Sequence, residues 1–131
     1  MKEENELIVE GEQVEYIFFP GDPLVVSHGQ FRFKNESAGA KTCTINSCQF
    51  VENDAAVPLD VFHGYAGDTL IKGAVNVPPK SELSIRITFP FREVHVGVRF
   101  RYEVRVSVAC EGKQYDATSK LNVILEKPGT F

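Results

Sequence analysis

Hydrophobic and polar residues alternate most regularly near the end of the chain, over residues 99–110. Every second residue from position 100 is apolar, and the residues between them are mostly charged or polar. A period of two is typical of a β-strand with one buried face and one face in water. A second alternating run, over residues 115–125, follows Glu111 and Gly112, which predicts a turn between two strands.

A two-residue turn at Glu111 and Gly112 fixes the pairing of these strands, because Cys110 then lies opposite Lys113. The predicted opposed pairs are Val108–Tyr115, Val106–Ala117, Val104–Ser119, Tyr102–Leu121 and Phe100–Val123. In this register the apolar residues of both strands share one face, and a slip of one residue would separate them. The sequence therefore predicts a hairpin of defined register in an all-β domain.

Shorter apolar stretches, separated by turn residues, continue along the rest of the chain. The pattern predicts further strands over residues 7–9, 14–19, 24–35, 41–51, 57–62, 70–77 and 83–89. Proline and glycine mark the breaks at residues 20–23 and 78–79. No segment has a convincing helical period, so we expect an antiparallel β-sandwich of about eight strands.

Three segments resemble immunoglobulin-like and fibronectin-like sandwiches. They are residues 31–35 with the polar loop that follows, residues 77–83 before an alternating strand, and residues 102–106 in the closing hairpin. The resemblance implies an immunoglobulin-like sandwich but no particular family, and a shared architecture assigns no activity. Residues 20–22 before a strand are also similar to an arrestin-like sandwich. We expect an acidic, frayed segment over residues 1–12 and a single sandwich domain over residues 13–127.

Composition and charge narrow the classes of function. The 131 residues, 43% hydrophobic and 24% charged, are typical of one globular domain. A net charge of -4 argues against nucleic-acid binding, which relies on neutralising phosphates. The acidic start is not a signal peptide, and no apolar run has membrane-spanning length. We expect a cytoplasmic protein with no membrane insertion, or a secreted one if a signal peptide has been removed.

The three cysteines are an odd number, which favours a reducing compartment. Cys43 and Cys48 have opposite parity on one predicted strand, and a bulge near residues 46–47 would turn both inward. The spacing of Cys48 and Cys110 fits the inter-sheet cystine of an immunoglobulin domain, but the tryptophan that usually accompanies it is absent. We expect all three to be buried thiols, since free cysteine behaves as a small hydrophobic residue.

No motif of the sequence indicates catalysis or metal binding. His28, His63 and His95 lack metal-ligand spacing, and there is no Gly-x-Ser-x-Gly elbow or glycine-rich nucleotide loop. Residues 35–37 fit the pattern of a glycosylation acceptor, which matters only in a secreted protein. We expect a non-enzymatic protein without cofactor or metal.

Five of the six arginines lie between Arg86 and Arg105. Arg99, Arg101 and Arg105 share the polar face of their predicted strand. We expect Arg86, Arg99, Arg101 and Arg105 to form a docking face for an acidic protein, because arginine is enriched at interface hot spots. Two alternatives are that these charges only keep the sheet face soluble, or that the acidic N-terminal segment folds onto them.

A second candidate is the predicted loop over residues 61–68, which sets Phe62, His63, Tyr65 and Asp68 beside two glycines. End loops of sandwiches often bind partners, and aromatic residues give contact area at low entropic cost. Alternatively, the aromatic residues cap the core, or His63 with its neighbours forms a small-ligand or hydrolytic site. The sequence thus predicts a module that binds a protein partner or a second copy, or an accessory domain of a larger assembly. The contact would use the arginine face, the loop or an edge strand.

Overall fold

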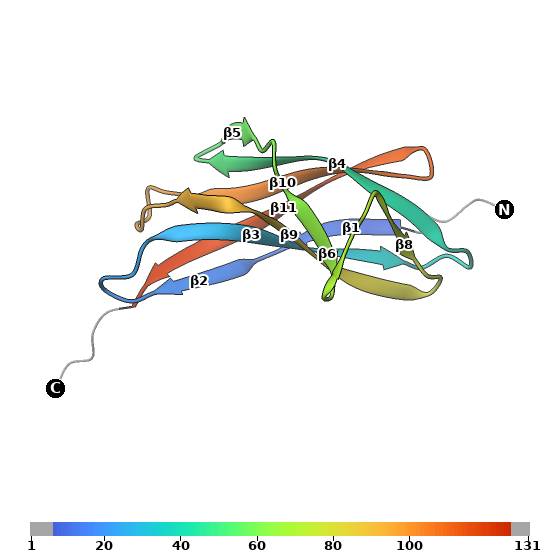
Figure 1. Cartoon of the computed structure of the whole chain (residues 1–131), viewed down its shortest axis with the longest axis horizontal. Coiled ribbons are helices and arrows are strands. Elements are labelled where there is room, and N and C mark those ends of the chain that lie inside the picture. The colour runs from blue at the N-terminus through green and yellow to red at the C-terminus, as the bar shows by residue number, and fades with distance from the viewer. Residues whose placement is uncertain (1–6, 127–131) are drawn as a thin grey trace.

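The computed structural model describes residues 7–126, which form two β-sheets packed face to face (Figure 1). The five-stranded sheet contains, in spatial order, β1 (Leu7–Glu12), β3 (Val25–Asn35), β9 (Ser81–Glu93), β6 (His63–Ala66) and β7 (Thr69–Leu70). The six-stranded sheet contains β2 (Val14–Phe18), β11 (Lys113–Leu125), β10 (Tyr102–Cys110), β4 (Lys41–Glu52), β5 (Ala55–Pro58) and β8 (Ala74–Val77), the last two both pairing with β4. The predicted all-β sandwich is confirmed.

Residues 7–126 form eleven strands where about eight were expected. The strands predicted over residues 57–62 and 70–77 are replaced by four shorter ones, β5 to β8. Pro58 removes a backbone donor where β5 ends, and Gly67 and Gly73 turn the chain with φ of 62° and 83°. One pair of strands is also parallel and not antiparallel, namely β2 with β11.

The closing hairpin has the predicted register. Cys110 pairs with Lys113 and Val104 with Ser119, around a turn in which Glu111 and Gly112 have φ of 51° and 82°. Left-handed conformations at both central residues are typical of the type I′ turn that suits the strand twist. However, β10 begins at Tyr102, so the predicted pair Phe100–Val123 is not formed.

The core lies between the sheets and follows the alternation of the strands. Val104 of β10 is fully buried and faces Gly29 of β3 in the opposite sheet. A Cβ added at Gly29 would lie only 2.8 Å from the Cβ of Val104. The two sheets approach this closely because position 29 has no side chain.

The cysteines correct an expectation. Asn46 is the extra residue of a bulge in β4, because Ser107 pairs with Ser47 whereas Val108 pairs with Ile45. The predicted bulge turns Cys43 and Cys48 into the core, but Cys43 then lies opposite Cys110 in the same sheet and forms a disulfide with it. The expectation of three thiols is therefore wrong, and the bridge is not the inter-sheet Cys48–Cys110 cystine. Cys48 remains a free, buried thiol, and burial raises its pKa to about 12.

The start of the described chain is part of the sandwich. β1 pairs with β3 from Leu7 to Glu12, so this stretch is not frayed, while the predicted frayed residues 1–6 and the domain end at 127 lie outside the described residues. Glu10 and Glu12 form ion pairs with Arg32 of β3, at 2.6 and 3.8 Å. These two acidic residues therefore do not fold onto the predicted arginine face. Residues 7–126 include no helix of the length and hydropathy needed to cross a membrane.

Candidate binding surfaces

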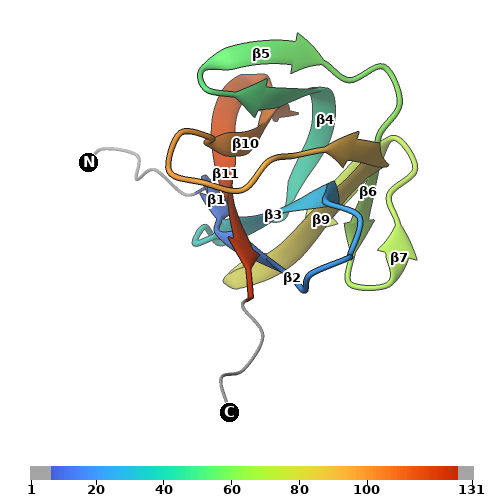
Figure 2. The same cartoon turned by 90° about the vertical axis from the view of Figure 1, so that its left-hand side faces the viewer.

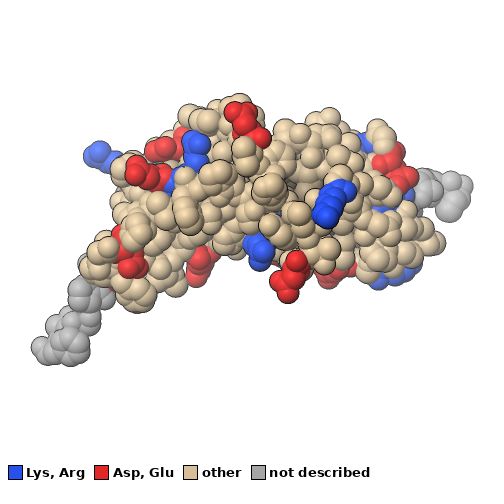
Figure 3. Space-filling model, in the orientation of Figure 1, with Lys and Arg blue, Asp and Glu red and all other residues tan. Residues whose placement is uncertain are grey.

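The structure separates the four arginines of the predicted docking face. Arg86 lies on β9 in the five-stranded sheet, and Arg105 lies on β10 in the six-stranded sheet. Arg99 and Arg101 lie on the loop of residues 94–101 between β9 and β10, because β10 starts only at Tyr102. The expectation that Arg99, Arg101 and Arg105 project from one face of one strand is therefore wrong. On the face shown in Figure 3, basic side chains are separated and interspersed with acidic ones.

Two of these arginines are paired with nearby carboxylates. Arg101 Nη2 lies 3.2 Å from Asp54 Oδ2, and the N–H of Arg101 donates a 2.8 Å hydrogen bond to Asn53 Oδ1. Arg105 Nη2 lies 3.4 Å from Glu103 Oε1. For Arg86 and Arg99 there is no ion pair with any residue between 7 and 126. A binding role for these arginines stays a prediction.

The second predicted site is not a loop over most of its length. Residues 63–66 form β6, which pairs with β9 and sets His63 beside Thr88 and Tyr65 beside Arg86. The Cζ atom of Arg86 lies 5.0 Å from the centre of the Tyr65 ring. The structure thus brings together residues that the sequence placed in two different sites. Phe62 instead packs against the core, and Asp68 is exposed between β6 and β7.

The alternative of a hydrolytic site around His63 gains no support. His63 is exposed, and it does not line the groove described below. Within residues 7–126 no cluster of three or more histidine, cysteine, aspartate or glutamate side chains is arranged to hold a metal ion. Asn35 of the glycosylation pattern is fully buried, and its amide donates to the carbonyls of Gly39, Val77 and Pro78, so it is not accessible as an acceptor.

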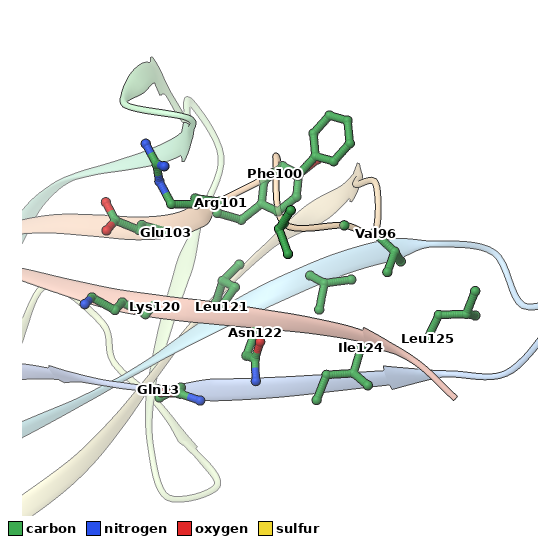
Figure 4. Close-up of a pocket in the computed structure, with 14 residues that line it drawn as sticks. Gln13, Val96, Phe100, Arg101, Glu103, Lys120, Leu121, Asn122, Ile124 and Leu125 are labelled. Carbon is green, nitrogen blue, oxygen red and sulfur yellow. The ribbon is translucent and has the colours of Figure 1, made fainter. Parts of the chain in front are cut away.

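A groove that the sequence did not indicate lies along the end of β11. The pairing of β10 with β11 stops at Tyr102 and Leu121, whereas β2 stays paired with β11 as far as Leu125. Residues 122–125 therefore have a strand neighbour on one side only. On the other side the 94–101 loop diverges from β11 and leaves a groove of about 890 Å³ (Figure 4).

Apolar and polar side chains both line the groove. Its apolar lining comes from both the loop and β11: Val96, Val98, Phe100, Leu121, Val123, Ile124 and Leu125. Its polar lining is Gln13, Arg101, Glu103, Lys120 and Asn122. Ile17 of β2 lies beside Ile124 and is 52% exposed, so the apolar surface continues past the groove.

The 94–101 loop crosses the end of the sandwich from β9 to β10 (Figure 2) and has a defined shape. The hydroxyl of Tyr102 accepts a 2.8 Å hydrogen bond from the N–H of His95, and the N–H of Phe100 donates to the carbonyl of Gly97 at 3.1 Å. The rings of His95 and Phe100 lie 4.9 Å apart. These contacts hold Val98 at the tip of the loop, where it is 99% exposed.

No family model matches the chain, and no curated protein matches it. Its fold is similar to part of a family 123 glycoside hydrolase from Clostridium perfringens, with 11% identity, a TM-score of 0.55, and coverage of 93% of this chain and 28% of that one. The structure of the Salmonella enterica SafA pilin in complex with the SafB chaperone matches with 9% identity, a TM-score of 0.51, and coverage of 96% and 57%. The E. coli chaperone DraB matches with 13% identity, a TM-score of 0.50, and coverage of 91% and 54%.

The chain thus spans at most 57% of these three proteins. At such low identities the similarity concerns the fold and carries no activity or partner to this chain. Together with the sheet order, these structures show that the chain has an immunoglobulin-like β-sandwich fold.

Proposed function

We propose that this domain is a non-enzymatic protein-binding module, and that an extended segment of a partner protein binds in the groove along β11. The observation that carries the proposal is the early end of the β10–β11 ladder at Leu121, beside an apolar groove. The partner segment would take the place that β10 leaves empty next to residues 122–125.

The backbone of β11 favours an extended occupant. A strand without a neighbour presents unpaired N–H and C=O groups, which another strand can satisfy. Residues 122–125 span about 13 Å at the rise of a β-strand, which suits about four residues of a partner. Alternate side chains of that segment would contact the apolar lining on the loop side and point to solvent on the other.

The edges of β7, β5 and β1 are less suited to this role. β7 has only two residues, and β5 ends in Pro58, which lacks an N–H. The edge of β1 lies against β11, because a Cβ at Gly11 would overlap the carbonyl of Thr118. The edge of β11 at residues 122–125 suits a partner better than these edges, because apolar side chains line the groove beside it.

The charges and the disulfide refine the proposal. Arg99, at the tip of the loop beside the groove, favours a partner segment with an acidic residue at one end. The buried disulfide between Cys43 and Cys110 favours an oxidising compartment over the cytoplasm that the odd number of cysteines suggested.

Selection of a displayed library of random twelve-residue peptides on the immobilised domain tests the proposal. We expect peptides with alternating apolar residues, whose affinity falls about tenfold or more, roughly 1.4 kcal/mol, in Val98→Asp and Leu125→Asp variants. Val57→Asp is the matched control, since Val57 on the β5 edge is 43% exposed and Leu125 is 42% exposed. Equal losses in all three variants, or a selection without specific binders, would contradict the proposal.

A further inference from the structure

Two rows of polar side chains cross the outer face of the five-stranded sheet, where β3, β9 and β6 lie side by side. The registers of these strands set Gln30, Arg86 and Tyr65 in one row and His28, Thr88 and His63 in the next. The residues between the two rows are buried on all three strands, so the six side chains point away from the core.

Arg86 is the centre of this surface. Its guanidinium lies over the Tyr65 ring, and it forms no ion pair with the described residues 7–126. Arg32 on the same sheet, in contrast, forms ion pairs with three carboxylates. They belong to Glu10, Glu12 and Glu82, at 2.6, 3.8 and 3.5 Å from its nitrogens. On this face carboxylates neutralise Arg32, whereas no carboxylate of residues 7–126 lies within ion-pair distance of Arg86.

Hydrogen-bond donors lie beside Arg86, and the row continues past Gln30 to Glu12 of β1, which forms an ion pair with Arg32. His28 stands in the row next to Arg86, and burial, followed by the positive charge of Arg86, lowers its pKa. Thr88 and His63 offer a hydroxyl and an exposed imidazole in the next row. All these side chains stand on paired strands, which hold them in place before a ligand arrives.

We propose that these two rows form a second binding site, which takes an acidic segment of a protein partner. A carboxylate of the segment pairs with the guanidinium of Arg86, whose planar fork is suited to two parallel hydrogen bonds. The stacking of that guanidinium on Tyr65 fixes its plane and leaves N–H groups for the ligand. The hydroxyl of Thr88 and the exposed imidazole of His63 donate to a neighbouring carboxylate or carbonyl.

A short acidic peptide suits the site better than a nucleic acid. The whole chain carries a net charge of -4, so a long polyanion is repelled by most of the surface. This site lies on the five-stranded sheet, whereas the β11 groove lies along a strand of the six-stranded sheet. It therefore goes beyond the proposed function, and either site can fail without the other.

A titration of the isotope-labelled domain with a ten-residue peptide of alternating glutamate and threonine, followed by NMR, tests the inference. At low salt we expect amide shifts on β3, β6 and β9 around the two rows. We expect Arg86→Gln to weaken binding about fivefold to tenfold, the equivalent of about 1 to 1.4 kcal/mol. Arg105→Gln, which removes the same charge from the other sheet, leaves the affinity within about twofold, and Arg86→Lys falls between.

Three results would overturn the inference. The first is equal weakening by Arg86→Gln and Arg105→Gln, since only overall charge would then matter. The second is unchanged affinity when glutamine replaces every glutamate of the peptide. The third is tighter binding of a ten-nucleotide single-stranded RNA at the same rows. The amide spectrum of each free variant is recorded first, so that a loss of fold is distinguished from a loss of binding.

Discussion

The hydroxyl of Ser119 donates a 2.6 Å hydrogen bond to the carbonyl oxygen of Glu12, across the boundary between the two sheets. The same hydroxyl oxygen accepts a 3.0 Å hydrogen bond from the N–H of Gln30, the residue that pairs with Glu12 in the five-stranded sheet. Ser119 is fully buried. One hydroxyl group therefore links β11 to both β1 and β3 on the side where β1 passes into β2.

Removing this hydroxyl is expected to destabilise the domain. Ser119→Ala leaves a carbonyl and an N–H without their partner, which costs about 1 to 3 kcal/mol of the free energy of unfolding. Urea denaturation measures the change. Ser107→Ala is the control, because Ser107 points outward from β10 and should change stability by less than about 0.5 kcal/mol. Similar shifts in the two variants would show that the hydrogen bonds of Ser119 do not matter.

The burial of Val104 and the exposure of Arg101 predict a strong contrast between two substitutions. Val104→Asp places a carboxylate without a partner in the core, against Gly29, and should cost several kcal/mol, on the order of the stability of a small domain. Arg101→Ala removes an ion pair whose side chains are 68% and 82% exposed, and should cost less than about 1 kcal/mol. The urea midpoints of the two variants are compared, and equal shifts would contradict the burial of Val104 in the core.

Thiol titration should distinguish the three cysteines. The native protein is expected to react slowly, because Cys48 is buried and burial raises its pKa to about 12. In urea without reductant one thiol should react, and after reduction three, since Cys43 and Cys110 are bridged. Three reactive thiols in urea without reductant would mean that the bridge does not form.

His28 makes stability depend on pH. Burial and the charge of Arg86 lower its pKa from the ordinary 6.5, and its Nδ1 lies 2.9 Å from the hydroxyl of Tyr16. As the pH falls, the unfolded chain takes up this proton before the folded one does. The contribution of His28 to the free energy of unfolding is therefore fully present above its unfolded pKa. It decreases as the pH falls towards its folded pKa.

We expect the urea midpoint of the protein to fall between about pH 7.5 and about pH 5, and His28→Gln to reduce that slope. The same slope in the wild type and in His28→Gln would place the titrating group elsewhere.

The alternation of apolar and polar residues predicted the features that depend on which residues face the core. The hairpin register, the burial of Val104 and the bulge in β4 all follow from which residues must face the core. Alternation did not reveal where a ladder ends. Phe100 has the parity of β10, yet the turn at Gly97 carries it into the loop, and this early end opens the groove.

Neighbours across strands were also hidden from the sequence. Tyr65 and Arg86 lie side by side only because residues 63–66 join the edge of β9, where two glycines had suggested a loop. The disulfide likewise depends on which strands are neighbours in a sheet. Cys43 meets Cys110 because β4 and β10 are neighbours in one sheet and the bulge sets their register.

Hydrogen–deuterium exchange of the domain, with and without a peptide selected from the library, tests directly whether a partner segment binds along β11. We expect new protection at residues 122–125 of β11 and in the 94–101 loop, because the bound segment covers the free edge and the groove. Leu125→Asp should abolish that protection, and Val57→Asp should not. Protection confined to β5 or β7, or absent from residues 122–125, would contradict the claim that β11 receives the partner.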